Sequence, residues 1–138
     1  MAEALARERS RQASLSSQFV FASAGVAPSR IGASADPRAI ACVGKAGLDL
    51  SAHGTRAVDQ DMLQNASLIL ALDLTVRDQL LGLGPEARPR IRLLMEYAPA
   101  LGVAEVADPW SGTAADYDHA FGLIQAATDR LVASLGTG

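Results

Sequence analysis

Residues 67–84, SLILALDLTVRDQLLGLG, hold the pattern that decides the fold class. The run SLILAL (67–72) is short and apolar, which predicts a strand buried on both faces. The next twelve residues, DLTVRDQLLGLG (73–84), predict a helix that ends at a glycine ahead of Pro85. A buried strand followed directly by a helix is typical of a parallel α/β sheet.

The segments before this stretch extend the same alternation. Residues 2–14 favour a helix because they are rich in Ala, Leu, Glu and Arg. The apolar run QFVFASAG (18–25) predicts a second buried strand that ends in small residues. VAPSRIGAS (26–34) contains many turn-forming residues and predicts a loop.

Two further helices are marked by their end signals. Asp36 can cap a helix with Pro37 in its first position, and Gly47 can close it. Asp59 can cap a shorter helix through QDMLQNA (60–66).

The C-terminal half completes the pattern. IRLLMEY (91–97) fits either a helix or a strand, and we interpret it as a strand because it is short and precedes Pro99. Apolar residues then recur every three or four positions, which predicts one long final helix. We therefore predict a single three-layer α/β domain over residues 1–138, with a small parallel sheet flanked by helices. The stripe of the final helix comprises Tyr117, Phe121, Ile124, Thr128, Leu131 and Leu135.

Composition indicates which kinds of partner and which cellular compartment to expect. The 138 residues carry a net charge of −3, which argues against a nucleic-acid partner. No apolar run approaches the ~18 residues of a membrane span, and no signal peptide is evident, so we expect no membrane partner. Cys42 is the only cysteine, which excludes an internal disulfide and favours a reducing compartment; we expect the cytoplasm.

Few residues could carry chemistry. In DPW (108–110), Asp108 lies between the last strand and the last helix, where a carboxylate beside Trp110 could act as a general acid. An ordinary Asp-Pro turn explains the same residues. His53, in SAHGTR (51–56), is interpreted as a hydrogen-bonded structural histidine, and His119 as part of a solvated helix face. Cys42 fits a small core residue better than a nucleophile.

Other site signatures are missing from the sequence. It shows no glycine-rich phosphate cradle, no metal-ligand cluster and no Ser/His/Asp arrangement. We therefore predict no metal and no cofactor.

A series of short motifs resembles the low-molecular-weight protein tyrosine phosphatases from Met1 to about Leu135. Each motif is weak alone, but six in the same order and at the same intervals identify the family. They are MAEALARER (1–9), SAG (23–25), DPRA (36–39), GLDLSAH (47–53), LILALD (68–73) and DPW (108–110).

The resemblance implies a segment ahead of Met1. In the family a central hydrophobic strand and a Cys-x-x-x-x-x-Arg-Ser-Pro phosphate loop directly precede the first helix. We therefore expect that the chain is truncated at its N-terminus and that its recorded start is too late. The first strand, the nucleophilic cysteine and the phosphate-binding arginine would all be missing. A sheet without its central strand is expected to be unstable, because neighbouring strands would lose their pairing and packing.

The resemblance also implies roles for four residues. Asp108 matches the general acid that protonates the leaving phenolate, while the thiolate attacks phosphorus and a cysteinyl-phosphate is then hydrolysed. Ser23 and His53 match residues that hold the phosphate loop by hydrogen bonds, and Trp110 matches an aromatic wall of the substrate cleft. The sequence departs from the family at SAGVAPSRIG (23–32), which lacks a Trp-His pair, and at HGTR (53–56).

Three functions remain open. The first is a phosphotyrosine phosphatase that is inactive as written and, once extended, acts on a phosphotyrosine protein or a small aryl phosphate. The second is a non-catalytic regulatory or phosphoprotein-binding module. The third, an arsenate reductase, is disfavoured because its chemistry needs more cysteines than Cys42 alone.

Overall fold

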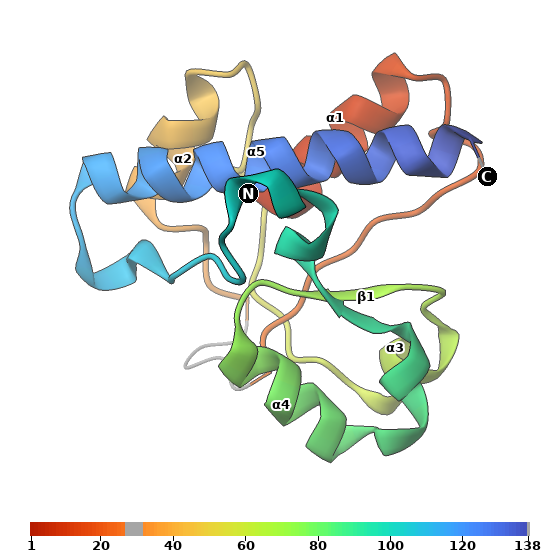
Figure 1. The fold of residues 1–138 in the computed structure, drawn as a ribbon. Helices are drawn as coiled ribbons and strands as arrows, with labels where there is room; N and C mark the ends of the chain where they lie inside the picture. The colour runs from red at the N-terminus through yellow and green to blue at the C-terminus, as the bar shows by residue number, and fades with distance from the viewer. Residues whose placement is uncertain (27–31, 138) are drawn as a thin grey trace.

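A short parallel sheet lies between helices in the computed structural model (Figure 1). Its strands are β1 (Ile69–Ala71) and β2 (Ile91–Leu93), paired in parallel so that Ile69 lies opposite Ile91. The structure describes residues 1–26 and 32–137, so the predicted loop at 26–34 lies largely outside the described residues.

Five α-helices and four short 3₁₀ helices are present in the described part of the chain. The α-helices are α1 (Ala2–Gln12), α2 (Pro37–Gly44), α3 (Gln60–Asn65), α4 (Leu74–Leu83) and α5 (Ala114–Thr137). The 3₁₀ helices are η1 (Pro85–Arg90), η2 (Leu94–Tyr97), η3 (Pro99–Leu101) and η4 (Pro109–Ser111).

The N-caps predicted at Asp36 and Asp59 are confirmed, and Asp73 caps a third helix in the same way. The side chains of Asp36, Asp59 and Asp73 accept hydrogen bonds from backbone N–H groups in the first turns of α2, α3 and α4. Such bonds satisfy N–H groups that have no partner inside a helix. After α2, Gly47 has a φ of 80°, a left-handed conformation that suits glycine and ends the helical path.

Alternate residues of β1 pack on opposite faces of the sheet. Leu70 packs against a cluster built mainly from α1, α2, α5 and η2, whereas Ile69 and Ala71 pack into a second cluster with α3 and α4. Because side chains alternate along a strand, this division shows that both faces of the sheet are covered. Figure 1 shows the same arrangement, with α5 on one side of β1 and α3 and α4 on the other. The predicted α/β class, with a small parallel sheet flanked by helices, is confirmed.

The predicted buried strand at 18–25 is wrong. Residues 19–24 belong to no strand, and only Gly25 forms an isolated bridge, to Ala57. Val20 is 95% exposed, while Phe19 and Phe21 are half-buried. An apolar run becomes a buried strand only where a neighbour supplies backbone hydrogen bonds and covering side chains, and these residues lack such a ladder. The expectation that a central strand is missing stays a prediction.

The other predicted elements form, with shorter strands. The strand expected at 67–72 contains β1, and the stretch 91–97 gives β2 followed at once by η2. The final helix buries its predicted stripe: Tyr117, Phe121, Ile124, Thr128 and Leu131 are buried and Leu135 is half-buried.

Candidate functional site

Asp108 lies beyond the carboxyl end of β1. Two residues before it, the N–H of Val106 donates to the carbonyl of Leu72 at 2.8 Å, which brings this segment to the end of the strand. Asp108 then starts η4, and its carboxylate accepts the N–H of Trp110 at 3.0 Å. The carboxylate is therefore held by a turn of its own loop while the residue stays exposed. A parallel α/β sheet usually carries its site at this end.

Trp110 presents its ring to solvent from the same loop. It is 70% exposed, an unusual position for the only tryptophan of the chain. Pro109 stands between Asp108 and Trp110 in the sequence, and its ring restricts the backbone that connects the carboxylate to the indole. Asp108 and Trp110, predicted as acid and aromatic wall, thus share one short 3₁₀ turn.

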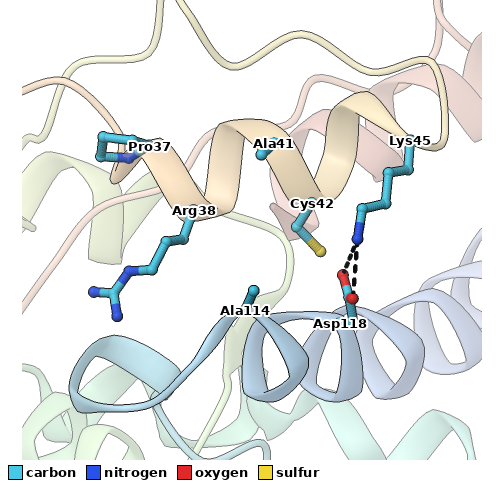
Figure 2. Close-up of a pocket in the computed structure, with 7 residues that line it drawn as sticks. All are labelled: Pro37, Arg38, Ala41, Cys42, Lys45, Ala114 and Asp118. Carbon is cyan, nitrogen blue, oxygen red and sulfur yellow. Dashed lines mark hydrogen bonds and ion pairs between the residues drawn. The ribbon is translucent and has the colours of Figure 1, made fainter.

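Arg38 of α2 binds the backbone of the loop that contains Asp108 and Trp110, a contact that the sequence did not predict. Its guanidinium donates to the carbonyls of Trp110 and Gly112, both at 2.7 Å. The same guanidinium pairs with Asp36 at 2.9 Å and lies over the Tyr117 ring, 4.8 Å from the centroid. Figure 2 shows Arg38 extending from α2 toward the segment that precedes α5. The motif DPRA (36–39) carries this residue, but no local pattern shows which loop it reaches.

The pKa values of this cluster reflect the ion pair. Hydrogen bonds from the Arg38 side chain and backbone lower the pKa of Asp36 to about 2. The same pair raises the pKa of Arg38. Burial, together with the negative charge of Asp36, raises the pKa of Tyr117. Asp36 is therefore a carboxylate and Tyr117 a neutral phenol at neutral pH.

Ser23 and His53 lie together in a different place. Both line a cavity of about 560 Å³ between α1 and the segment 47–56. The Ser23 hydroxyl donates to Glu3 of α1 at 3.2 Å, and Arg7 and Arg56 line the same cavity. In the described part of the chain, no hydrogen bond or ion pair joins this pair to Asp108 or Trp110. The structure thus groups the four predicted residues as two pairs.

Cys42 is a core residue, as predicted. It is 5% exposed, and its thiol lies 3.5 Å from the carbonyl oxygen of Tyr117. Burial raises the pKa of this thiol, which disfavours the thiolate that a nucleophile needs. In Figure 2 its sulfur points into the space between α2 and α5, in a pocket of about 220 Å³. The residues after Cys42, VGKAGL (43–48), place Leu48 where a Cys-x-x-x-x-x-Arg motif requires arginine.

Other candidates carry no site in the structure. His119 is exposed on α5, as predicted. Residues 1–26 and 32–137 hold no group of three or more His, Cys, Asp or Glu side chains placed to bind a metal ion. Across these ranges, no helix has both the length and the apolar character needed to span a membrane.

Comparison with known proteins agrees with the motif order. The family described as low molecular weight phosphotyrosine protein phosphatase matches residues 1–138. A low molecular weight protein-tyrosine-phosphatase of Streptomyces coelicolor is 32% identical, and the match covers 98% of this chain and 84% of the relative.

Solved structures share the fold. A protein tyrosine phosphatase from Entamoeba histolytica superposes with a TM-score of 0.92 at 22% identity, covering 99% of this chain and 88% of that one. The tyrosine phosphatase Wzb of Escherichia coli, solved with sulphate, gives a TM-score of 0.85 at 25% identity, covering 97% and 87%. The chain therefore belongs to the low-molecular-weight phosphotyrosine protein phosphatase family.

Proposed function

We propose that residues 1–138 supply the general acid and the aromatic wall of a phosphotyrosine phosphatase, but not its nucleophile. The observation that carries this proposal is the position of Asp108 and Trp110 in one exposed turn at the carboxyl end of β1. Phosphotyrosine is a substrate with an aromatic ring and a phenolate leaving group, so it needs both a ring contact and a proton. Phosphotyrosine proteins and small aryl phosphates are the substrates proposed.

Asp108 would donate its proton to the bridging oxygen as the P–O bond breaks, so that the phenol leaves neutral. Trp110 would stack on the substrate ring, because the residue is 70% exposed. Ser23 and His53 would hydrogen-bond to a phosphate loop seated in the cavity that they line.

Residues 1–138 contain no nucleophile suited to attack the phosphorus atom. The sequence contains no Cys-x-x-x-x-x-Arg motif, and its one thiol, on Cys42, is buried in the packing of α2 against α5. We therefore propose that the chain as written does not turn over phosphate esters, since nucleophile and oxyanion cradle are the dominant contributions to such catalysis.

Two proteins test the proposal with an aryl phosphate as substrate. The 138-residue chain should show no turnover above background. A fusion that places a family strand and Cys-x-x-x-x-x-Arg-Ser-Pro loop ahead of Met1 should be active, and it should lose most of that activity on Asp108→Asn. Turnover by the short chain that survives Cys42→Ala and disappears with Asp108→Asn would overturn the proposal.

The regulatory alternative makes a different prediction in the same experiment. A phosphoprotein-binding module would bind a phosphotyrosine peptide through the short chain without any turnover, and the fusion would remain inactive. Trp110 fluorescence, titrated with phosphotyrosine and with tyrosine as the control, distinguishes the two functions.

A further inference from the structure

We propose that Arg38 is a positioning residue, which holds the loop of Asp108 and Trp110 in one conformation by clamping two of its carbonyls to α2. The role of this clamp in catalysis rests on the function proposed above, whereas the clamp itself is a feature of the fold.

The clamp encloses the loop at two points. The carbonyls of Trp110 and Gly112 stand two residues apart, and each accepts from a different guanidinium nitrogen of Arg38 at 2.7 Å. The loop also has a hydrogen bond of its own: the N–H of Gly112 donates to the carbonyl of Pro109 at 2.8 Å and ends η4. A single side chain from α2 thus fixes both the turn and the exit of the loop toward α5.

The contact reaches the carboxylate through one residue. The N–H of Trp110 donates to Asp108 at 3.0 Å, and the carbonyl of Trp110 accepts from Arg38 at 2.7 Å. The two groups belong to adjacent peptide planes joined at the Trp110 Cα, so a displacement of the Trp110 backbone that breaks the carbonyl contact also shifts the N–H that orients the acid. Arg38 therefore acts on Asp108 through the Trp110 peptide groups and without touching the carboxylate itself.

Arg38 is itself held in place. Asp36 accepts from its Nε at 3.1 Å and from one terminal nitrogen at 2.9 Å, while the Tyr117 ring lies under the guanidinium. A planar fork with five N–H donors can serve a carboxylate and two carbonyls at once, and a lysine ammonium cannot match this geometry. The side chain is thus used for its shape as well as its charge.

The chain offers a matched control for the loss of this residue. Lys45 directly follows the last residue of α2 and also reaches α5, through an ion pair with Asp118 at 3.0 Å. That pair is exposed and touches no part of the loop 108–112. Removing Lys45 therefore removes a cation and a link between α2 and α5 but leaves the clamp intact.

Backbone order in the 138-residue chain is the direct test. We expect the NMR order parameters of Trp110 and Gly112 to be near the rigid value of ~0.85 in the parent chain and to fall below ~0.6 in Arg38→Met. Lys45→Met should leave both unchanged, and Arg38→Lys should give intermediate values. Because Trp110 is the only tryptophan, the decay of its fluorescence anisotropy reports the same loosening.

Several outcomes would overturn the clamp: unchanged order at Trp110 and Gly112 in Arg38→Met, full order in Arg38→Lys, or equal loosening in Lys45→Met. If Arg38→Met does not fold, Arg38→Lys and Asp36→Asn carry the same comparison, and full loop order in both contradicts the clamp.

A second readout links the clamp to catalysis in the fusion with the phosphate loop. Arg38→Met should reduce turnover of an ester with a poor leaving group more than turnover of an ester with an acidic phenol. The same change added to Asp108→Asn should not alter the ratio between the two turnover rates further, because the proton donor is already absent. If Arg38→Met loosens the loop but Asp108→Asn shows no leaving-group dependence, the proposed function fails while the clamp stands. An unchanged loop rejects the clamp whatever Asp108 does.

Discussion

At the scale of single residues, the chemistry depends on whether Asp108 is an acid or only a turn residue. Its hydrogen bond to the N–H of Trp110 is what an ordinary Asp-Pro turn would make. The turn and the acid are compatible, because a carboxylate has two oxygens and the turn uses one of them.

Leaving-group dependence separates the two roles in the fusion with the phosphate loop. We expect Asp108→Asn to lower turnover of esters with poor leaving groups by roughly 10²- to 10⁴-fold, the range for a positioned general acid. A substrate with an already acidic phenol should lose less, because its leaving group needs no proton. Equal losses for both substrates would show that Asp108 is structural.

Asp36 gives the clamp a definite pH range. Its pKa is lowered from 3.8 to about 2 because Arg38 donates to the charged form. A depressed folded-state pKa contributes stability that is fully present above the unfolded value and is lost as the pH falls through the folded value. We therefore expect the order of Trp110 to be constant from pH 7 to about 4 and to decline between pH 3.8 and 2.

Fluorescence anisotropy of Trp110 measures this titration, with far-UV circular dichroism to verify that α2 and α5 persist. Asp36→Asn should show a looser loop at neutral pH and no further change on acidification to pH 3. A loop that loosens already near pH 5 would assign the titration to a different group.

At the scale of elements, helix caps supply stability that does not depend on the sheet. The carboxylate of Asp73 accepts the N–H of Val76 at 2.7 Å and so caps α4 directly after β1. We expect Asp73→Ala to lower the free energy of unfolding by about 0.5–2 kcal/mol. Asp73→Asn should cost less, because asparagine also caps helices.

Urea unfolding measures both variants, and Asp78→Ala is the control. Asp78 lies on the same helix, is 68% exposed and forms an ion pair with its neighbour Arg77, at 3.3 Å. Its loss should change the free energy of unfolding by less than about 0.5 kcal/mol. A similar cost for Asp73→Ala and Asp78→Ala would mean that charge on α4 matters and the cap does not.

Residues 19–24 form a segment that pairs with no neighbouring strand. Val20 is 95% exposed and lies between the half-buried residues Phe19 and Phe21, so an apolar segment that belongs to no strand faces solvent. Such a segment can pair with another chain. We expect Val20→Lys to reduce self-association while changing the free energy of unfolding by less than about 0.5 kcal/mol.

Static light scattering over a range of protein concentrations tests this expectation. Leu101→Lys is the matched control, since Leu101 is 47% exposed but lies in the short helix η3. If the two variants reduce association equally, total surface hydrophobicity is responsible and the segment 19–24 is not.

At the scale of the whole molecule, the sheet is small for the helices that it supports. The described residues give two strands of three residues each, β1 and β2. Strands in globular proteins usually have about 5–6 residues and sheets about 4–6 strands. We therefore expect the 138-residue chain to melt below about 60 °C and to bind dyes that report exposed apolar surface.

Calorimetry and dye fluorescence measure these properties. The fusion that supplies the family strand is the informative comparison, because it should melt at a higher temperature and bind less dye. A cooperative, monomeric transition of the short chain above about 60 °C would contradict the expectation and show that its sheet is sufficient.

The sequence by itself determined the helices, because their signals are local. Asp36, Asp59 and Asp73 stand where a cap is needed, and the spacing of apolar residues from Tyr117 to Leu131 defines the buried face of α5. The order of the motifs also determined the family, since it lies in the chain itself. The alternation also placed Asp108 in the loop before the last helix, but it did not show that this loop lies beyond the end of β1.

Only the tertiary structure decided the rest. The run 18–25 has the composition of a buried strand but forms no strand. A strand exists only where a neighbouring strand supplies backbone hydrogen bonds, and here only Gly25 forms an isolated bridge. Arg38 reaches carbonyls more than 70 residues away, and Ser23 and His53 line one cavity although they are far apart in the sequence. Such contacts depend on how the elements pack together, and a local sequence pattern does not show which distant residue will become a neighbour in the fold.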